Sequence, residues 1–310
     1  MQTRRATVGA MVLLAAMIAG TVAGCSNPSA GHGGPNGTLG VVTSFYPIEY
    51  AVQQIGGSHV SVTSLTKPGA EPHDIELSPQ QVATITDTQL VVYAAGFQPA
   101  VDEAVSQQAA NRAFDVAPTA DLNRPAPVEG GAAPAAGAKD PHFWLDPERY
   151  EAVSKAIGAR LAQVDPAHAS DYAGNTTAFV GRLAALDTAF KQGTASCATN
   201  DLVTSHAAFG YLSARYGFTQ VPITGLDPDI EPSAADLSRI ADFVRAHAVT
   251  TIYAEPLVAP KFADTIAQST GATIAVLDPL EGITSRSAGT DYLEVMRSNL
   301  ATLQKGQGCR

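Results

Sequence analysis

Short runs of β-branched and aliphatic residues alternate with helical patterns along most of this chain. The runs that predict strands are residues 39–43, 60–66, 90–93, 202–204, 250–253 and 273–277. Helices are expected between them, starting near Pro47, Ser78, Pro147, Ala167, His206, Ser233 and Pro260. Because parallel neighbours in a sheet need a crossover connection, strand and helix in repeated succession indicate an α/β fold with largely parallel sheets.

The length of the chain argues for more than one hydrophobic core. It has 310 residues, of which 45% are hydrophobic and 15% are charged, and such a chain usually divides into two domains. Its formal net charge is -10, which makes it a poor candidate for nucleic-acid binding.

One long helical stripe lies near the middle of the sequence. Its larger or β-branched residues are spaced 4, 3, 4, 3 and 4 apart, and they are Tyr172, Thr176, Phe179, Leu183, Leu186 and Phe190. A helix of about 24 residues would be about 36 Å long. We therefore expect a rigid linking helix over residues 166–194, between an N-terminal α/β domain over 39–165 and a C-terminal one over 195–310.

The N-terminal segment has the pattern of a lipoprotein signal. Arg4 and Arg5 precede an apolar run that is too short to span a membrane, and small residues come directly before Cys25. The pattern predicts a signal peptide over residues 1–24, a lipidated Cys25 and a flexible tether over 25–38, and hence an extracytoplasmic protein anchored to the cell membrane. The alternative is a free thiol after an ordinary signal peptide.

Lipidation of Cys25 would leave Cys197 and Cys309 as an even pair. In an oxidising compartment such a pair favours one disulfide bond. The alternative, a metal site with two thiolates, has no suitable third ligand near either cysteine.

Four side chains that can bind a metal lie at the ends of predicted strands or at the starts of helices. They are His73, His142, His206 and Asp278, and more than 60 positions separate each from the next. The carboxyl ends of parallel strands share one edge of a sheet, and ligands gather there. We therefore expect three imidazoles and one carboxylate to meet in a cleft between the two domains.

Three imidazoles and one carboxylate form a ligand set that Zn²⁺ accepts with tetrahedral geometry. Mn²⁺ prefers more oxygen ligands, and it is the alternative metal. Glu255 ends another predicted strand and could bind the second ring nitrogen of a ligand imidazole. It could equally be a carboxylate at the start of a helix with no role at the metal.

Four segments of the chain resemble, in order, the ligand segments of the cluster A-I solute-binding proteins of bacterial metal ABC transporters, in particular the zinc-binding ZnuA-like branch. The segments are PGAEPHD (68–74), DPHFWLDP (140–147), TSHAAFGY (204–211) and LDPL (277–280). The resemblance extends from about residue 39 to the end of the chain.

This resemblance implies two α/β domains joined by one long helix, with His73, His142, His206 and Asp278 as ligands. It also implies a disulfide between the two remaining cysteines, and the histidine at the third ligand position is the zinc-type pattern. One departure is the loop 124–139, which contains no histidine, whereas many zinc-binding members have a histidine-rich loop there.

The function implied is capture of Zn²⁺ and its delivery to an ABC transporter permease. The chain contains no G-x-x-x-x-G-K-[ST] motif, so a separate ATPase would drive transport, and no enzymatic activity is expected. Affinity should fall as the pH drops through about 6.5, where protons compete for the imidazoles. The alternatives are manganese or iron transport, a zinc hydrolase with Asp278 off the metal, and a surface adhesin in which the metal is structural.

Overall fold

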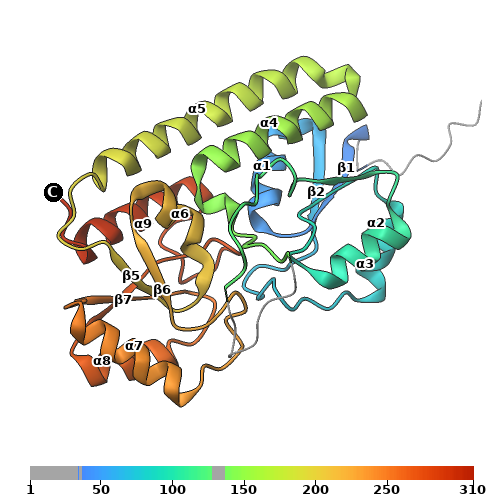
Figure 1. Cartoon of the computed structure of the whole chain (residues 1–310). Coiled ribbons are helices and arrows are strands. Elements are labelled where there is room, and N and C mark those ends of the chain that lie inside the picture. The colour runs from blue at the N-terminus through green and yellow to red at the C-terminus, as the bar shows by residue number, and fades with distance from the viewer. Residues whose placement is uncertain (1–33, 35–36, 128–136) are drawn as a thin grey trace, which may run out of the picture. The chain divides into compact units, whose positions relative to one another are not determined.

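Two four-stranded parallel sheets organise the protein in the computed structural model, which describes residues 34, 37–127 and 137–310 (Figure 1). The first sheet has the order β2-β1-β3-β4, and its strands are β1 (Leu39–Thr43), β2 (Val60–Ser64), β3 (Leu90–Tyr93) and β4 (Ala113–Asp115). The second has the order β6-β5-β7-β8, and its strands are β5 (Asp201–Thr204), β6 (Thr219–Pro222), β7 (Thr251–Ala254) and β8 (Thr273–Val276). The prediction of an α/β fold with parallel sheets is confirmed.

Helices connect successive strands within each sheet, connect the first sheet to the second, and follow the last strand. They are α1 (Tyr46–Gly56), α2 (Pro79–Asp87), α3 (Pro99–Gln108), α4 (Pro147–Val164), α5 (Ala169–Gly193), α6 (Gly210–Tyr216), α7 (Ala234–Ala246), α8 (Lys261–Thr270) and α9 (Tyr292–Gly306). Two of the expected helix starts are capped by their own side chains. Ser78 accepts a hydrogen bond from the amide of Gln81, and Asp146 accepts one from the amide of Glu148; a proline follows each cap.

The sequence analysis did not predict β4, β6, α3 and α9. Both strands lie at sheet edges and are only three and four residues long, so neither shows a clear apolar alternation. The apolar stripe of α9 is interrupted by Asn299, a polar residue that is nevertheless buried.

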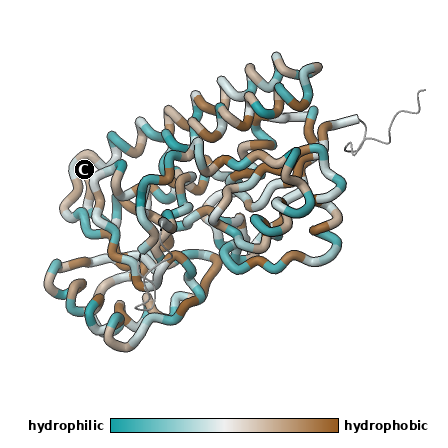
Figure 2. The backbone as a smooth tube through the Cα atoms, turned by 45° about the vertical axis from the view of Figure 1, so that its right-hand side comes forward, coloured by the Kyte–Doolittle hydropathy of each residue, from teal (hydrophilic) through white to brown (hydrophobic). Residues whose placement is uncertain are grey.

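Helix α5 is as long as the apolar stripe predicts. It runs for 25 residues, and its buried side includes Tyr172, Phe179, Leu183, Leu186 and Phe190, while Thr176 is half-buried. Figure 2 shows hydrophobic residues recurring along this helix between hydrophilic ones. The helix packs against α1 and α4 beside the first sheet and against α9 beside the second. One hydrophobic core cluster includes residues from both sides, so α5 ties the two sheets together.

Residues 32–310 form one compact unit, and the expected domain boundaries at 165 and 194 remain a prediction. We call the first sheet with α1–α4 the first lobe, and the second sheet with α6–α9 the second lobe. Residues 1–24, Cys25 and most of the expected tether 25–38 lie outside the described residues. Among the described helices none is long and apolar enough to cross a membrane.

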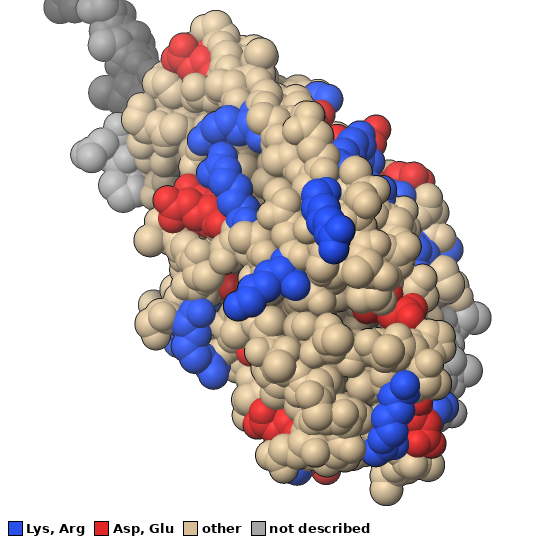
Figure 3. Space-filling model, turned by 90° about the vertical axis from the view of Figure 1, so that its left-hand side faces the viewer, with Lys and Arg blue, Asp and Glu red and all other residues tan. Residues whose placement is uncertain are grey.

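The surface carries charges of both signs. On the face shown in Figure 3, Lys and Arg side chains are interspersed with Asp and Glu and do not form one continuous basic surface. An extended basic surface is the feature that electrostatic binding of nucleic acid requires, and this face does not offer one.

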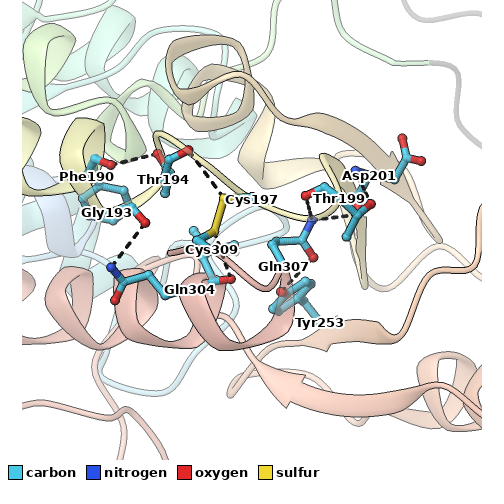
Figure 4. Close-up of a disulfide and its surroundings, with 11 residues drawn as sticks. Phe190, Gly193, Thr194, Cys197, Thr199, Asp201, Tyr253, Gln304, Gln307 and Cys309 are labelled. Carbon is cyan, nitrogen blue, oxygen red and sulfur yellow. Dashed lines mark hydrogen bonds between the residues drawn. A yellow bond between two sulfur atoms is a disulfide. The ribbon is translucent and has the colours of Figure 1, made fainter.

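A disulfide bond between Cys197 and Cys309 fixes the C-terminal end of the chain, as predicted (Figure 4). The Gln304 side chain donates a hydrogen bond to the carbonyl of Gly193, and the Gln307 side chain donates one to the carbonyl of Asp201. The end of α9 is therefore joined both to the end of α5 and to the start of β5.

Replacing both cysteines by serine should lower the free energy of unfolding by about 2–5 kcal/mol, because the bond closes a loop of 112 residues in the unfolded chain. Cys197 precedes β5, at the opposite end of that strand from His206, so metal affinity should be unchanged. Chemical denaturation and calorimetry of the same variant would measure both quantities. A large loss of metal affinity in a folded variant would contradict the separation of the two sites.

Candidate metal centre

Three imidazoles and one carboxylate meet in the interior of the protein between the two sheets. The carboxylate is that of Glu281, and its Oε1 atom lies 3.4 Å from Nε2 of His73, 3.0 Å from Nε2 of His142 and 3.2 Å from Nε2 of His206. His73 is 8% exposed, and the other three side chains have no exposed surface. In the part of the chain that the structure describes, this is the one group of three or more such ligands that could hold a metal ion.

The distances from the carboxylate to the three imidazoles suit a tetrahedral zinc site, and all four ligand atoms lie within 4.8 Å of one another. Zinc bonds to imidazole nitrogen and carboxylate oxygen of about 2.0–2.1 Å put neighbouring ligand atoms at the corners of a tetrahedron, about 3.3 Å apart. The three distances from Glu281 Oε1 lie close to that value. The second carboxylate oxygen, Oε2, is buried and has no hydrogen-bond partner among the described residues, so it too is available to an ion.

His73 lies on the loop between β2 and α2. Its backbone amide donates a hydrogen bond to Oε1 of Glu71, and its ring packs edge-on against the ring of Phe97, with 4.7 Å between the centroids. The buried side chain of Gln98 donates hydrogen bonds to the carbonyl of Pro72 and to the hydroxyl of Thr66. The loop that carries His73 is thereby attached to the end of β2 and to the start of α3.

His142 is oriented by the aspartate two residues before it. Oδ1 of Asp140 accepts hydrogen bonds from the backbone amide of His142, at 3.0 Å, and from its Nδ1 atom, at 2.8 Å. With the proton on Nδ1, the Nε2 atom is left to face Glu281. Carboxylates commonly hold metal-binding imidazoles in this way.

His206 follows β5 and is held in the same way by Glu255, which follows β7. Oε1 of Glu255 accepts a hydrogen bond from Nδ1 of His206, at 2.8 Å, and another from the hydroxyl of Ser205, at 2.6 Å. The carboxylate and the imidazole come from neighbouring strands, since β5 pairs with β7. Glu255 therefore lies where the sequence analysis placed an outer carboxylate.

The structure corrects the fourth residue of the expected site. Asp278 does not join the three histidines, and Glu281 takes the place that was assigned to it. Oδ1 of Asp278 accepts a hydrogen bond from the amide of Leu280 at 2.8 Å, and the backbone of Asp278 is held on both sides by the amide of Asn299. Burial raises the pKa of Asp278 to about 6.

Asp278 has a local role, because it shapes the turn that delivers Glu281. After β8, the carboxylate of Asp278 accepts a hydrogen bond from the Leu280 amide, and Leu280 adopts a left-handed conformation with φ 59°. The indole of Trp144 also donates a hydrogen bond to the carbonyl of Pro279. The turn sends the next side chain, that of Glu281, towards the histidines.

A signal for Glu281 is present in the sequence. An aspartate followed by proline is a frequent turn former, because its side chain bonds to the backbone two residues on. That role occupies the carboxylate of Asp278, and the next acidic residue, Glu281, is then the better ligand candidate. The position of Asp278 at the end of the strand favoured it as the ligand, and Glu281 was therefore not predicted.

Burial and mutual contact shift the pKa values of His142, His206 and Glu281. Burial alone would lower the pKa of His206, but the charges of Glu255 and Glu281 raise it well above its ordinary value. For His142, burial is likewise outweighed by hydrogen bonds to Asp140 and Glu281, and its pKa is raised. Burial would raise the pKa of Glu281, but the imidazoles around it hold that pKa well below the usual range.

Glu71 adds a further acidic group beside this cluster. Burial, and then the charge of Glu281, raise the pKa of Glu71 to about 8. Without a metal, the cluster therefore retains protons at neutral pH. A divalent cation that replaces those protons would supply the positive charge that the buried carboxylate requires.

Comparison with known proteins points to one family. The profile of the family described as "Zinc-uptake complex component A periplasmic", ZnuA, matches residues 41–306. The chain is 33% identical over 296 residues to the high-affinity zinc uptake system protein ZnuA of Bacillus subtilis (strain 168), covering 91% of this chain and 92% of that protein.

Solved structures agree with this comparison. The Zn(II)-bound ZnuA-like domain of Streptococcus pneumoniae AdcA is 32% identical, with a TM-score of 0.74, and the match covers 87% of this chain and 99% of that domain. This chain spans about 60% of the full-length AdcA lipoprotein of that species. The laminin-binding protein Lmb of Streptococcus agalactiae, described as bifunctional with adhesin and metal transporting activity, is 32% identical with a TM-score of 0.76, over 87% of this chain and 99% of that one.

Substitution of the two acidic residues separates their roles. Glu281→Gln removes the charge of the proposed ligand and should weaken zinc binding by 100-fold or more, because three imidazoles would then hold the ion without a carboxylate. The matched variant Asp278→Asn keeps a side-chain oxygen that can accept the hydrogen bond from the Leu280 amide. Its zinc affinity should therefore stay within a few-fold of that of the unmodified protein. Calorimetric titration with Zn²⁺ measures both. The reverse order of effects would restore Asp278 as the ligand.

The raised histidine pKa values predict the pH dependence of binding and of stability. The charged imidazoles of His142 and His206 stabilise the metal-free fold fully below about pH 6.5, and this contribution is lost as the pH rises through their higher folded pKa values. Zinc needs the neutral nitrogens, so as the pH is lowered the affinity should begin to fall while the pH is still above 6.5, at a higher pH than ordinary histidines would imply.

Calorimetry in two buffers of different ionisation enthalpy should detect protons released when zinc binds at pH 7. The stabilisation by zinc, measured as the rise in Tm, should increase between pH 6 and 8. Affinity that stays constant over that range, with no proton release, would contradict the assignment of these imidazoles as ligands.

Proposed function

Because the chain belongs to the ZnuA family of zinc-uptake proteins, we propose that it captures Zn²⁺ outside the cytoplasm and delivers the ion to the permease of an ABC transporter. The observation that carries this proposal is the preformed, buried group of His73, His142, His206 and Glu281. The distances between its ligand atoms, the types of its ligands and its position between the two lobes suit an ion that the protein encloses and later releases.

The ligand set supports zinc as the cargo. Three nitrogens and one oxygen are typical of zinc, whereas manganese prefers sites with more oxygen. The nitrogens are also held rigidly, since carboxylates fix His142 and His206 at Nδ1. Manganese or iron is the second candidate cargo for the same site.

The same geometry argues against a hydrolase. A catalytic zinc site keeps one position open for water, beside three protein ligands. Here Glu281 lies within 3.4 Å of all three imidazole nitrogens and occupies the fourth corner. A binding role without enzymatic activity therefore accounts best for these side chains.

The remaining parts of the proposal concern the location and the partners of the protein. We place it outside the cytoplasm, in the periplasm or on the outer face of the cytoplasmic membrane, and anchored to the cell membrane through a lipid on Cys25, with residues 25–38 as the lipidated tether. Its partners are the permease and the separate ATPase of the transporter. The description of the family as periplasmic and the small residues before Cys25 support this placement.

Release of the ion requires a movement in the protein. His142, His206 and Glu281 have no exposed surface, so a bound ion could not leave while all four side chains keep their positions. Among the four ligands, the side chain of His73 has some exposed surface. It lies on the loop that runs from the end of β2 to the start of α2. We place the exit at this loop, where the permease would have to displace it.

Adhesion is a second candidate function, because the similar protein Lmb is described as both an adhesin and a metal transporter. If the metal is cargo, stripping it should leave the protein folded and empty. A purely structural metal would be needed to keep the protein folded. Circular dichroism after chelation, followed by addition of Zn²⁺, distinguishes the two roles of the metal.

The direct test is metal competition. Protein exposed to equimolar Zn²⁺, Mn²⁺ and Fe²⁺ and then freed of unbound ions should contain one equivalent of zinc by elemental analysis. His206→Glu should shift the preference towards Mn²⁺, because an oxygen replaces a nitrogen. The control is His247→Gln, since His247 is half-exposed and pairs with Asp201. Retention of manganese or iron by the unmodified protein would overturn the choice of cargo.

A further inference from the structure

A buried carboxylate between two arginines lies beside the metal centre, and it joins the two lobes. The carboxylate is that of Asp146, which is 5% exposed and caps the start of α4, four residues after His142. Its Oδ2 atom lies 3.3 Å from Nε of Arg149, on α4, and its Oδ1 atom lies 3.2 Å from Nε of Arg215, on α6. The two arginines come from opposite lobes.

Arg215, on α6, contacts two other helices at once. Its Nε donates a hydrogen bond to Oδ1 of Asp187 on α5, at 2.6 Å, and its Nη1 pairs with Glu148 on α4. The hydroxyl of the next residue, Tyr216, also donates a hydrogen bond to Asp187, at 3.1 Å. Through this one side chain, α6 of the second lobe is fixed to α4 of the first lobe and to the linking helix.

A tyrosine of α6 makes a second connection, closer to the metal ligands. Tyr211 is 2% exposed, and its hydroxyl donates a hydrogen bond to the carbonyl of Asp140, at 3.0 Å. The guanidinium of Arg149 lies over its ring, 4.6 Å from the centroid. Asp140 is the residue whose carboxylate holds Nδ1 of His142, so Tyr211 supports that ligand from the other lobe.

The approach of the two lobes at this place leaves no room for an extra carbon atom. A Cβ added to Gly210, the first residue of α6, would lie 2.4 Å from Oδ2 of Asp140. The carboxylate that orients His142 therefore packs directly against the start of the helix that follows His206. The absence of a side chain at Gly210 is required for that contact.

We propose that Asp146, Arg149, Tyr211 and Arg215, which we call the interlobe latch, position His142 relative to His206 and thereby determine zinc affinity and site geometry. This inference rests on the proposed zinc-binding function. The latch residues do not touch the ion. They hold the segment that contains Asp140 and His142 against the helix that follows His206.

Two physical arguments connect the latch to metal binding. A buried ion pair contributes little net stability, because both groups lose their hydration, and in several proteins buried polar groups serve instead to fix one geometry. A metal site needs its ligands within about 0.5 Å of the productive arrangement. Since His142 and His206 belong to different lobes, their separation depends on contacts such as these, and residues that orient ligands typically change metal affinity by 10- to 100-fold.

Three variants test the latch in the otherwise unchanged protein. Arg215→Gln removes the charge that joins α4, α5 and α6, and it should lower zinc affinity by about tenfold or more. Arg215→Lys keeps the charge but cannot bridge the same carboxylates, so its effect should be intermediate. Tyr211→Phe removes the hydroxyl that donates to the Asp140 carbonyl and accepts from the Arg124 amide, but it keeps the ring beneath Arg149. It therefore tests the latch even if Arg215→Gln does not fold.

Cobalt provides a measurement that a merely stabilising role would not change. Co²⁺ in the tetrahedral site of the unmodified protein should show intense visible absorption bands, and these should weaken or shift in the latch variants as the ligands separate. The matched control is Arg239→Gln, since Arg239 is exposed and pairs only with its neighbour Asp236 on α7 among the described residues. A lower Tm with unchanged cobalt spectrum and zinc affinity would overturn the proposal.

Hydrogen exchange of the metal-free protein separates this inference from the proposed function. In Arg215→Gln, amides of residues 140–148 and 210–216 should lose protection, while those of the outer strand β2 keep theirs. If the unmodified protein failed to bind zinc, the proposed function would fall, and the exchange data would still show whether the latch joins the lobes. Unchanged exchange in both segments would refute the latch itself.

Discussion

The convergence of three imidazole nitrogens on the carboxylate of Glu281 is the interaction on which the rest of the structure depends. A carboxylate with no exposed surface is costly to bury unless positive charge or hydrogen-bond donors surround it. Protonated imidazoles supply that charge in the metal-free protein, and a divalent cation would supply it in the loaded one. The site is therefore stable in both states, as a protein that binds and releases its cargo requires.

The fold brings these groups together by using the same edge of each sheet. His206 follows β5 directly, and Glu255 follows β7, the neighbouring strand. In the first lobe, the loops after β2 and before α4 supply His73 and His142. Helix α5 packs against both lobes, and the interlobe latch adds polar contacts close to the ligands. Rigid helices and buried carboxylates thus hold ligands that are far apart in sequence.

Much of this arrangement could be predicted from the sequence. The alternating strand and helix patterns indicated parallel sheets, the apolar stripe indicated α5, and the two remaining cysteines indicated the disulfide. The three histidines stood out because of their places at strand ends and helix starts. The strand, helix and histidine signals are local and can be read in short windows of residues, whereas the disulfide was predicted from the number of cysteines in the whole chain.

The parts that could not be predicted depend on tertiary contacts. Asp278 was chosen as a ligand because it follows β8, but the backbone turn at Leu280 brings Glu281 to the site instead. The latch was not foreseen, because Asp146 and Arg215 are 69 positions apart and become partners only when α4 and α6 pack together. The edge strands β4 and β6 were not predicted because they are short, and only their pairing with β3 and β5 identifies them as strands.

Diffraction from crystals of the zinc-loaded protein, recorded above and below the zinc absorption edge, tests the central claim most directly. The account predicts one anomalous peak between the lobes, within about 2.0–2.2 Å of Nε2 of His73, His142 and His206 and of a carboxylate oxygen of Glu281. A peak coordinated by Asp278 in place of Glu281, or located outside the three imidazoles, would contradict it.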